Sequence, residues 1–209
     1  HKLFFGRTFM DEHYKDVLYD KIQVNVASVI EKIDIYSLGM LVPYGIILLG
    51  MEYNIPMNIF ILDNEPKEAV KMTCDKHVVK MVIESVQMLS TTMWENHFEG
   101  PYRPTHKNHP CTIWARKSLQ NHQWLWDYTN QLGKEYTYRY GKQHKSHTVL
   151  LEKIPYDIDL PSIGLTPFPQ AMPDEYKCDD AVMAYRKYYI NEKADICTWK
   201  NREVPSWFW

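Results

Sequence analysis

The sequence contains no closely spaced pair of cysteines. Its four cysteines, Cys74, Cys111, Cys178 and Cys197, are widely separated, and none of them forms a C-x-x-C motif. Small secreted domains stabilised by disulfides have a much denser cysteine pattern. This spacing therefore favours reduced thiols in a cytosolic protein over a disulfide framework.

A long apolar run is also missing. The most apolar stretch, residues 38–51, is interrupted by Pro43 and three glycines, whereas a helix that spans a membrane needs about 20 apolar residues. The chain starts at His1 without the charged and then apolar pattern of a signal peptide. We therefore expect no membrane anchor, no targeting segment and a cytoplasmic location.

The chain has no strong excess of charge of either sign. It contains 24 Lys and Arg residues and 26 Asp and Glu residues, for a net charge of −2. Binding to nucleic acid would therefore have to come from local segregation of charge. The 209 residues are 45% hydrophobic and 14% aromatic, which is enough to bury a real core in one globular domain.

The apolar pattern predicts a mainly α fold. We expect residues 57–209 to form a compact helical domain with a short extended segment at its start, over 58–63, and a long proline-rich loop over 154–173. Residues 1–56 do not share this pattern, and they are interpreted as an accessory or upstream segment.

Turn and capping residues predict where the helices lie. One helix starts near Pro66 and, directly or after a kink, leads into a helical stretch over residues 74–92. A second starts at Pro110 and ends near Tyr140, with a kink near residues 121–122. A third follows Asp180, which is suited to cap it. The aromatic tail over residues 205–209 is expected to dock on the domain.

The helix over residues 74–92 has a polar face that holds several chemical groups. His77, Lys80 and Glu84 fall on this face, and the amine and the carboxylate are four residues apart. Two interpretations remain open at this point. The face is either the solvated side of a surface helix with one weak salt bridge, or one wall of an active site.

Two stretches, 100–126 and 136–151, contain basic and aromatic residues but no acidic residue. Cations that alternate with aromatic rings are typical of a groove that binds nucleic acid. The alternative is an aromatic core with an ordinary charged rim. On the first interpretation, the nucleic-acid-binding candidates are Arg103, His106, Lys107, His109, Arg116, Arg139, Lys142 and Lys145.

A metal site is a weaker possibility. Zinc ligands could come from Cys74, His77, His106, His109 and Cys111, but their spacing matches no strong zinc pattern. The sequence also lacks the G-x-S-x-G, P-loop and G-x-G-x-x-G motifs. We therefore assign no metal and expect no cofactor.

Residues 57–209 resemble small, mostly uncharacterised proteins of tailed phages. The blocks that carry this resemblance are MNIF-LD, CDKHVVK, PTHKNHP and EY-YRYGK-HKS. More distantly, Asp75-x-His77, with Glu84 seven residues after the histidine, resembles a helix of the pyrimidine-dimer DNA glycosylases of the endonuclease V type. The resemblance implies a DNA partner and a location in the cytoplasm of a phage-infected host cell.

This resemblance implies a mechanism in which an amine attacks C1′ of the damaged nucleotide, forms a Schiff base and then eliminates the strand. Glu84 would stabilise the sugar cation and assist the proton transfers. The family uses its main-chain N-terminal amine, which here would belong to Met57 or, if Met57 is removed, to Asn58. If residues 1–56 are part of the active chain, Lys80 is the substitute, with His77 beside it.

The leading interpretation is therefore a DNA base-processing or repair enzyme of the glycosylase and abasic-site lyase type. Two alternatives remain. The first is a metal-dependent hydrolase of nucleotides or nucleic acid, built on the histidine and cysteine residues. The second is a phage accessory protein that binds its partner through aromatic side chains and catalyses nothing.

Overall fold

The computed structural model describes residues 57–209, which contain helices, turns and irregular segments but no β-strand. The predicted mainly α fold is confirmed for this part of the chain. Residues Pro56–Trp209 group into one compact unit by their contacts, and a unit with its own buried core can in principle fold alone. We propose residues 57–209 as the domain; the expectation for residues 1–56 lies outside the described part.

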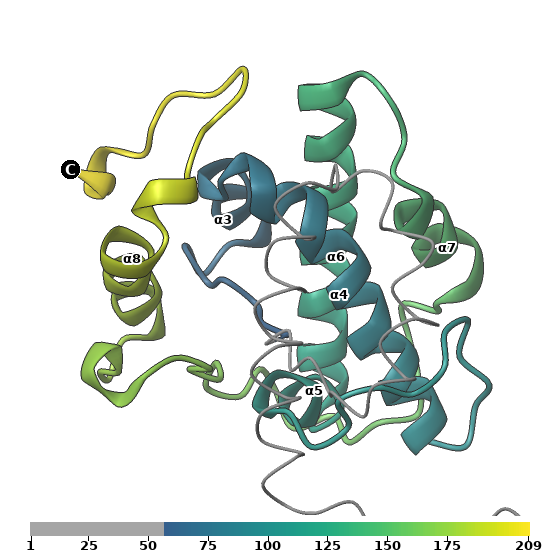
Figure 1. The fold of residues 1–209 in the computed structure, drawn as a ribbon. Coiled ribbons are helices and arrows are strands. Elements are labelled where there is room, and N and C mark those ends of the chain that lie inside the picture. Colours follow the sequence, from purple (N-terminus) through teal and green to yellow (C-terminus); the bar gives the residue numbers. More distant parts are fainter. Residues whose placement is uncertain (1–56) are drawn as a thin grey trace, which may run out of the picture. The chain divides into compact units, whose positions relative to one another are not determined.

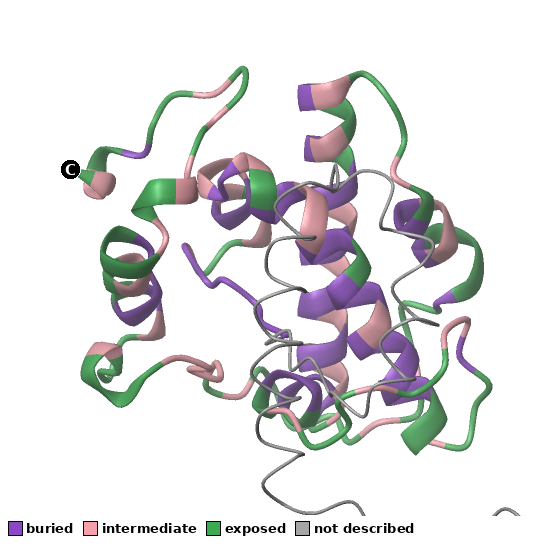
Figure 2. Ribbon diagram, in the orientation of Figure 1, coloured by how far each residue is buried: buried purple, intermediate pink, exposed green. Residues whose placement is uncertain are grey.

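Two long helices form the centre of the domain (Figure 1). They are α4, Asp75–Glu95, and α6, Leu119–Tyr140, which pack against each other along their length. Around this pair lie α3, Pro66–Met72, α5, Pro110–Ala115, and α7, Lys145–Lys153. Figure 2 shows that the sides of α4 and α6 that face their neighbours are largely buried.

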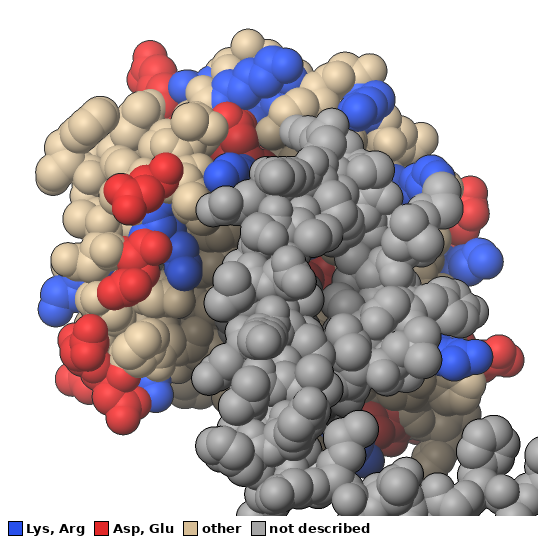
Figure 3. Space-filling view, in the orientation of Figure 1, with Lys and Arg blue, Asp and Glu red and all other residues tan. Residues whose placement is uncertain are grey.

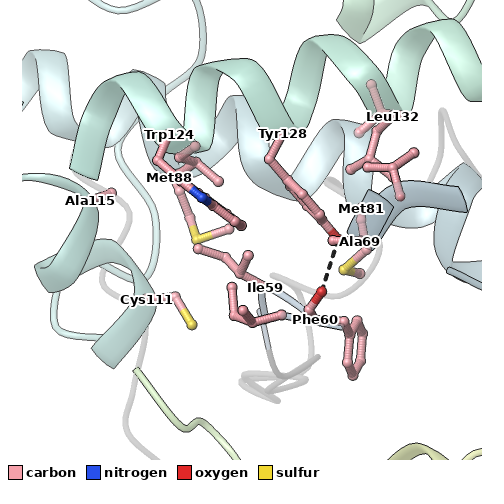
Figure 4. Close-up of a cluster of buried hydrophobic side chains, with 14 of the residues drawn as sticks. Ile59, Phe60, Ala69, Met81, Met88, Cys111, Ala115, Trp124, Tyr128 and Leu132 are labelled. Atoms are coloured by element: carbon pink, nitrogen blue, oxygen red, sulfur yellow. Dashed lines mark hydrogen bonds between the residues drawn. The ribbon is translucent and has the colours of Figure 1, made fainter. Parts of the chain in front are cut away.

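The segment before α3 is the most deeply buried irregular part of the described chain. Ile59, Ile61 and Leu62 have no exposed surface, and Phe60 has almost none. Figure 4 shows Ile59 and Phe60 among side chains of α4, α5 and α6, with the Tyr128 hydroxyl directed at the Phe60 carbonyl at 3.5 Å. The predicted buried segment is confirmed, but it pairs with no strand among the described residues.

The sequence left open whether the helix that starts at Pro66 continues into the next or is interrupted; the structure shows an interruption at residues 73–74. The single helix predicted from Pro110 to Tyr140 is wrong. It consists of α5 and α6, which are separated at residues 116–118 because the Ser118 hydroxyl caps α6 by accepting a hydrogen bond from the Asn121 backbone N–H at 3.1 Å. The helix α7 was not predicted; His144 caps its start.

After α7 the chain runs without regular structure through the proline-rich residues 154–173, as predicted. A short 3-10 turn, η3, Asp174–Tyr176, precedes the last α-helix, α8, Ala181–Glu192, whose first N–H groups are capped by Asp180. Two further 3-10 turns follow, η4, Ala194–Ile196, and η5, Ser206–Phe208.

The aromatic tail packs onto the domain, as predicted. The indole N–H of Trp199 donates to the Met72 carbonyl at 2.8 Å, and that of Trp207 contacts the Met72 sulfur at 3.2 Å. Among the aromatic residues of the tail, Trp207 and Phe208 are partly buried and Trp209 is 89% exposed. In residues 57–209, no helix is both long and apolar enough to span a membrane.

Candidate active site

The polar face of α4 points inward at Glu84. This side chain is only 5% exposed, although it carries a carboxylate. One carboxylate oxygen, Oε1, lies 3.0 Å from the Lys80 amine. The other, Oε2, accepts a hydrogen bond of 3.4 Å from the backbone nitrogen of Asn58. A buried carboxylate needs such partners. Lys80 and Asn58, both candidates from the sequence, therefore contact Glu84, the candidate catalytic carboxylate.

Asn58 is held from several sides. Its Nδ2 donates to the Ala171 carbonyl at 2.9 Å, and its Oδ1 accepts from the Tyr185 hydroxyl at 2.8 Å and from the Ile59 N–H at 2.8 Å. The side chain is therefore fully engaged and can adopt one orientation. That orientation directs the backbone nitrogen of Asn58 towards Glu84.

His77 lies one turn before Lys80 and is 7% exposed. Its ring stacks on Phe60 with a centroid separation of 4.2 Å, and its Nδ1 lies 2.6 Å from the Tyr189 hydroxyl. The neighbouring Cys74 thiol has its pKa lowered to about 4, chiefly by the hydrogen bond with Cys197 and further by His77, against the effect of burial. His77 is thus anchored within the core beside Cys74.

Burial raises the pKa of the Glu84 carboxyl above its ordinary value of 4.5, and the nearby Lys80 amine, the Asn58 N–H and His77 only partly oppose it. A carboxyl group with a raised pKa accepts and releases protons closer to neutral pH. Glu84 is therefore suited to take a proton from a group at the position of the Asn58 nitrogen.

The raised pKa of Glu84 predicts a pH-dependent stability. Because the folded state binds this proton more tightly than the unfolded chain, stability is greatest below the ordinary pKa of 4.5 and is lost as the pH rises through the folded-state value. A Glu84→Gln variant lacks this loss. Its free energy of unfolding relative to the wild type should therefore increase from acidic to neutral pH, measured by urea denaturation across that range. A difference that does not change with pH would contradict the prediction.

Most of the cations in the two acid-free stretches lie at the surface. Arg103, His106, Lys107, Lys142 and Lys145 are exposed. The first loop is tied to α4 and α7, because the Thr105 N–H donates to the Thr91 hydroxyl at 3.1 Å and the Tyr102 hydroxyl donates to Ser146 at 3.2 Å. The two stretches therefore lie on neighbouring elements.

Two other candidates in the first stretch have structural contacts as well. The Arg116 guanidinium donates to the Lys107 carbonyl, which holds it against the loop. His109 is half-buried and caps α5, since its Nδ1 accepts from the Cys111 N–H at 3.2 Å; burial and the nearby His106 lower its pKa. Arg116 is thus held against the loop, and His109 is tied to the start of α5.

Arg139 requires a correction. We expected it to contact phosphate, but its side chain has no exposed surface and forms ion pairs with Asp75 at 3.0 Å and Glu135 at 2.8 Å. Burial raises the pKa of Glu135, but hydrogen bonds from Arg202 and Arg139 outweigh it and lower that pKa. The guanidinium has no free edge for a phosphate, and we leave Arg139 out of the DNA-binding set.

The residues of the metal alternative do not converge. His77 lies in the core, His106 is exposed on its loop, and burial raises the pKa of Cys111 to about 12, so that its thiol stays protonated. Among residues 57–209, no group of three or more His, Cys, Asp or Glu side chains could hold a metal ion. The metal-dependent hydrolase therefore has no ligand set in the described domain.

Sequence reasoning missed the residues that surround Asn58. Tyr185 and Ala171 come from α8 and from the proline-rich segment, and Tyr189 of α8 reaches His77. These tyrosines were visible only as an aromatic-rich helix, without a signal for their role. The contacts of Ala171 and Tyr185 with Asn58 span more than a hundred positions of sequence.

Charge is unevenly distributed over the face drawn in Figure 3. Acidic side chains gather over α8 and the segment before it, whereas many Lys and Arg side chains lie along the opposite and upper edges. Phosphate groups are repelled by the acidic side. The outer surface of α8 therefore does not favour a polyanionic ligand.

The family model described as pyrimidine dimer DNA glycosylase matches residues 57–148. This range is less than half of the 209 residues. It includes α4 with Glu84, the whole acid-free stretch 100–126 and most of the stretch 136–151. The chain resembles that family, and the match supports a DNA repair function of the glycosylase type at family level, with DNA as the substrate. No curated protein and no solved structure gives a significant match.

Proposed function

We propose that this protein is a DNA glycosylase and abasic-site lyase that acts on damaged DNA, with the α-amine of Asn58 as nucleophile and Glu84 as catalytic carboxylate. The observation that carries the proposal is the 3.4 Å contact between the Asn58 backbone nitrogen and Glu84 Oε2. Both residues are 5% exposed. A nitrogen beside a buried carboxylate with a raised pKa is the pairing that nucleophilic amine catalysis needs.

The chemistry follows from this pair. A neutral amine attacks C1′, the C1′–N bond to the base breaks, and the leaving base takes up a proton. The attacking nitrogen passes a proton to Glu84. The C1′–O4′ bond of the sugar ring then breaks, O4′ takes up that proton, and the nitrogen becomes an iminium bound to C1′. Removal of a C2′ proton then allows the 3′ phosphate to leave, and water releases the enzyme. Glu84 serves first as the charge that stabilises the sugar cation and then as the proton carrier.

The proposal requires a free amine at residue 58. In a chain that continues through residues 1–57 the Asn58 nitrogen is an amide, which is a very poor nucleophile. We therefore propose that the active form begins at Asn58, after loss of Met57, and that Met57 itself is the next candidate. The family match begins at Met57, which supports a chain start at Met57; the loss of that residue is part of the proposal.

Lys80 and His77 are proposed to assist. Lys80 has the alternative amine, but its Nζ is 3.0 Å from Glu84 and its side chain is 42% exposed, so it is better suited to offset charge than to act as a neutral nucleophile. His77, which is packed between Phe60 and Tyr189 one turn before Lys80, would support this wall of the site. Phosphate contacts are assigned to Arg103, His106, Lys107, His109, Arg116, Lys142 and Lys145.

Borohydride trapping tests this proposal. The full chain and a chain released from a ubiquitin fusion so that it begins at Asn58 are incubated with ultraviolet-irradiated or abasic duplex DNA and reduced. We expect a covalent adduct only with the Asn58-start chain, because only that chain has the α-amine beside Glu84. Peptide mapping by mass spectrometry should locate the adduct on residue 58.

Two controls separate the candidate amines. A Met57-start chain tests the amine one residue earlier, and Lys80→Arg in the Asn58-start chain retains the charge but removes the alternative nucleophile. An adduct mapped to Lys80, or lost in Lys80→Arg, would assign the nucleophile to Lys80 instead. If no chain gives an adduct, the lyase mechanism is excluded.

A further inference from the structure

We propose that Tyr185, on α8, is a positioning residue that holds the Asn58 nitrogen against Glu84. This inference rests on the proposed function, and it concerns a part of the chain beyond the residues 57–148 matched by the family model. It assigns to the C-terminal part of the domain the task of completing the active site.

Tyr185 is fully buried and its hydroxyl joins three segments. It lies 2.8 Å from Asn58 Oδ1 and 3.0 Å from the Pro169 carbonyl, and it accepts the Ala171 N–H at 3.3 Å. Burial raises the pKa of Tyr185 well above its ordinary value. The hydroxyl therefore stays protonated and remains a donor at every pH at which the enzyme works.

The Asn58 amide is enclosed by this arrangement. Its oxygen faces Tyr185, while its nitrogen donates to the Ala171 carbonyl at 2.9 Å. Ala171 therefore contacts both Asn58 and Tyr185, and the three residues form a closed cycle of hydrogen bonds. Buried amides keep such partners because an unpaired one is costly. The cycle fixes the rotamer of Asn58, and with it the direction of the backbone nitrogen.

The contact that matters for chemistry is the weakest in the group. The Asn58 N to Glu84 distance is 3.4 Å, whereas the bonds from Tyr185 and to Ala171 are 2.8 and 2.9 Å. The side-chain bonds therefore determine where the nitrogen lies, and Glu84 alone does not. A free α-amine at residue 58 has lost the chain before it and depends still more on these bonds.

The structural part of the proposal is tested in the full chain by amide hydrogen exchange at Asn58. Tyr185→Phe removes only the hydroxyl, and we expect exchange at Asn58 to accelerate about ten-fold relative to the slowest core amides, the effect of one buried hydrogen bond. The matched control is Tyr128→Phe, which removes a hydroxyl as buried as that of Tyr185 but bonded to the Phe60 carbonyl instead. The control should leave Asn58 exchange unchanged.

The chemical part is tested in Asn58-start chains by single-turnover trapping at saturating abasic DNA. We expect Tyr185→Phe to lower the rate constant of adduct formation about ten-fold. Its DNA affinity and melting temperature should equal those of Tyr128→Phe. A purely structural role would lower stability in both variants without this selective loss of rate.

The outcomes separate the two proposals. If the parent Asn58-start chain forms no adduct while Tyr185→Phe still accelerates Asn58 exchange, the proposed function fails and the positioning of Asn58 stands. If the parent chain forms the adduct and Tyr185→Phe matches Tyr128→Phe in exchange or in rate, the positioning role is overturned.

Discussion

Glu84→Gln is expected to lower the rate of adduct formation and strand cleavage by about 10²- to 10⁴-fold, the usual contribution of a general acid–base group. Glutamine fills nearly the same volume and can still accept the Asn58 N–H through its oxygen. It cannot accept a proton or stabilise a sugar cation with a full charge. The change therefore removes the chemistry while it leaves the packing of α4 in place. Single-turnover assays on abasic duplex DNA with the Asn58-start chain measure the effect.

A matched control lies on the same helix. Glu95 ends α4 and is exposed, so that Glu95→Gln changes the net charge equally and should leave the rate within about two-fold, as surface substitutions generally do. If Glu84→Gln retains full activity on damaged DNA, Glu84 is not the catalytic carboxylate. Glu84→Gln could also leave the biological effect of the protein unchanged while Trp126→Ala or Trp207→Ala abolishes it. That result would favour the alternative of a binding protein without catalytic activity.

Arg139→Ala is expected to destabilise the domain by about 3–5 kcal/mol, the usual effect of removing one partner of a buried ion pair. The Arg139 side chain has no exposed surface, and it serves Asp75, Glu135 and the Lys71 carbonyl, with distances of 3.0, 2.8 and 3.1 Å. Its loss leaves Glu135 with Arg202 alone and removes a cation from the start of α4. Urea denaturation monitored by circular dichroism measures the change.

The control for this prediction is Lys142, a surface cation from the same acid-free stretch as Arg139. Lys142 is exposed and forms no ion pair with another of the described residues, and Lys142→Ala should change stability by no more than about 0.5 kcal/mol. If Arg139→Ala is as mild as Lys142→Ala but weakens DNA binding, Arg139 does reach phosphate and our correction is mistaken.

The local features of the domain could be predicted because they depend on neighbouring residues. Pro66 and Asp180 start helices by rules that act within a few positions. The four-residue spacing of Lys80 and Glu84 places both on one face of α4, and the structure joins them at 3.0 Å. The break before α6 was missed because Ser118 competes as a cap within an otherwise helical pattern.

The sequence by itself determined the helical fold, the polar face of α4 and the two acid-free basic stretches, since helix periodicity, capping and composition act over short distances. Only the tertiary structure decided which of those residues meet. Asn58 reaches Glu84 across 26 positions and Tyr185 across 127, and Arg139 pairs with Asp75 in the interior instead of facing solvent. Such pairings depend on how the packed helices exclude water from some polar groups and leave others at the surface, and no local pattern encodes that choice.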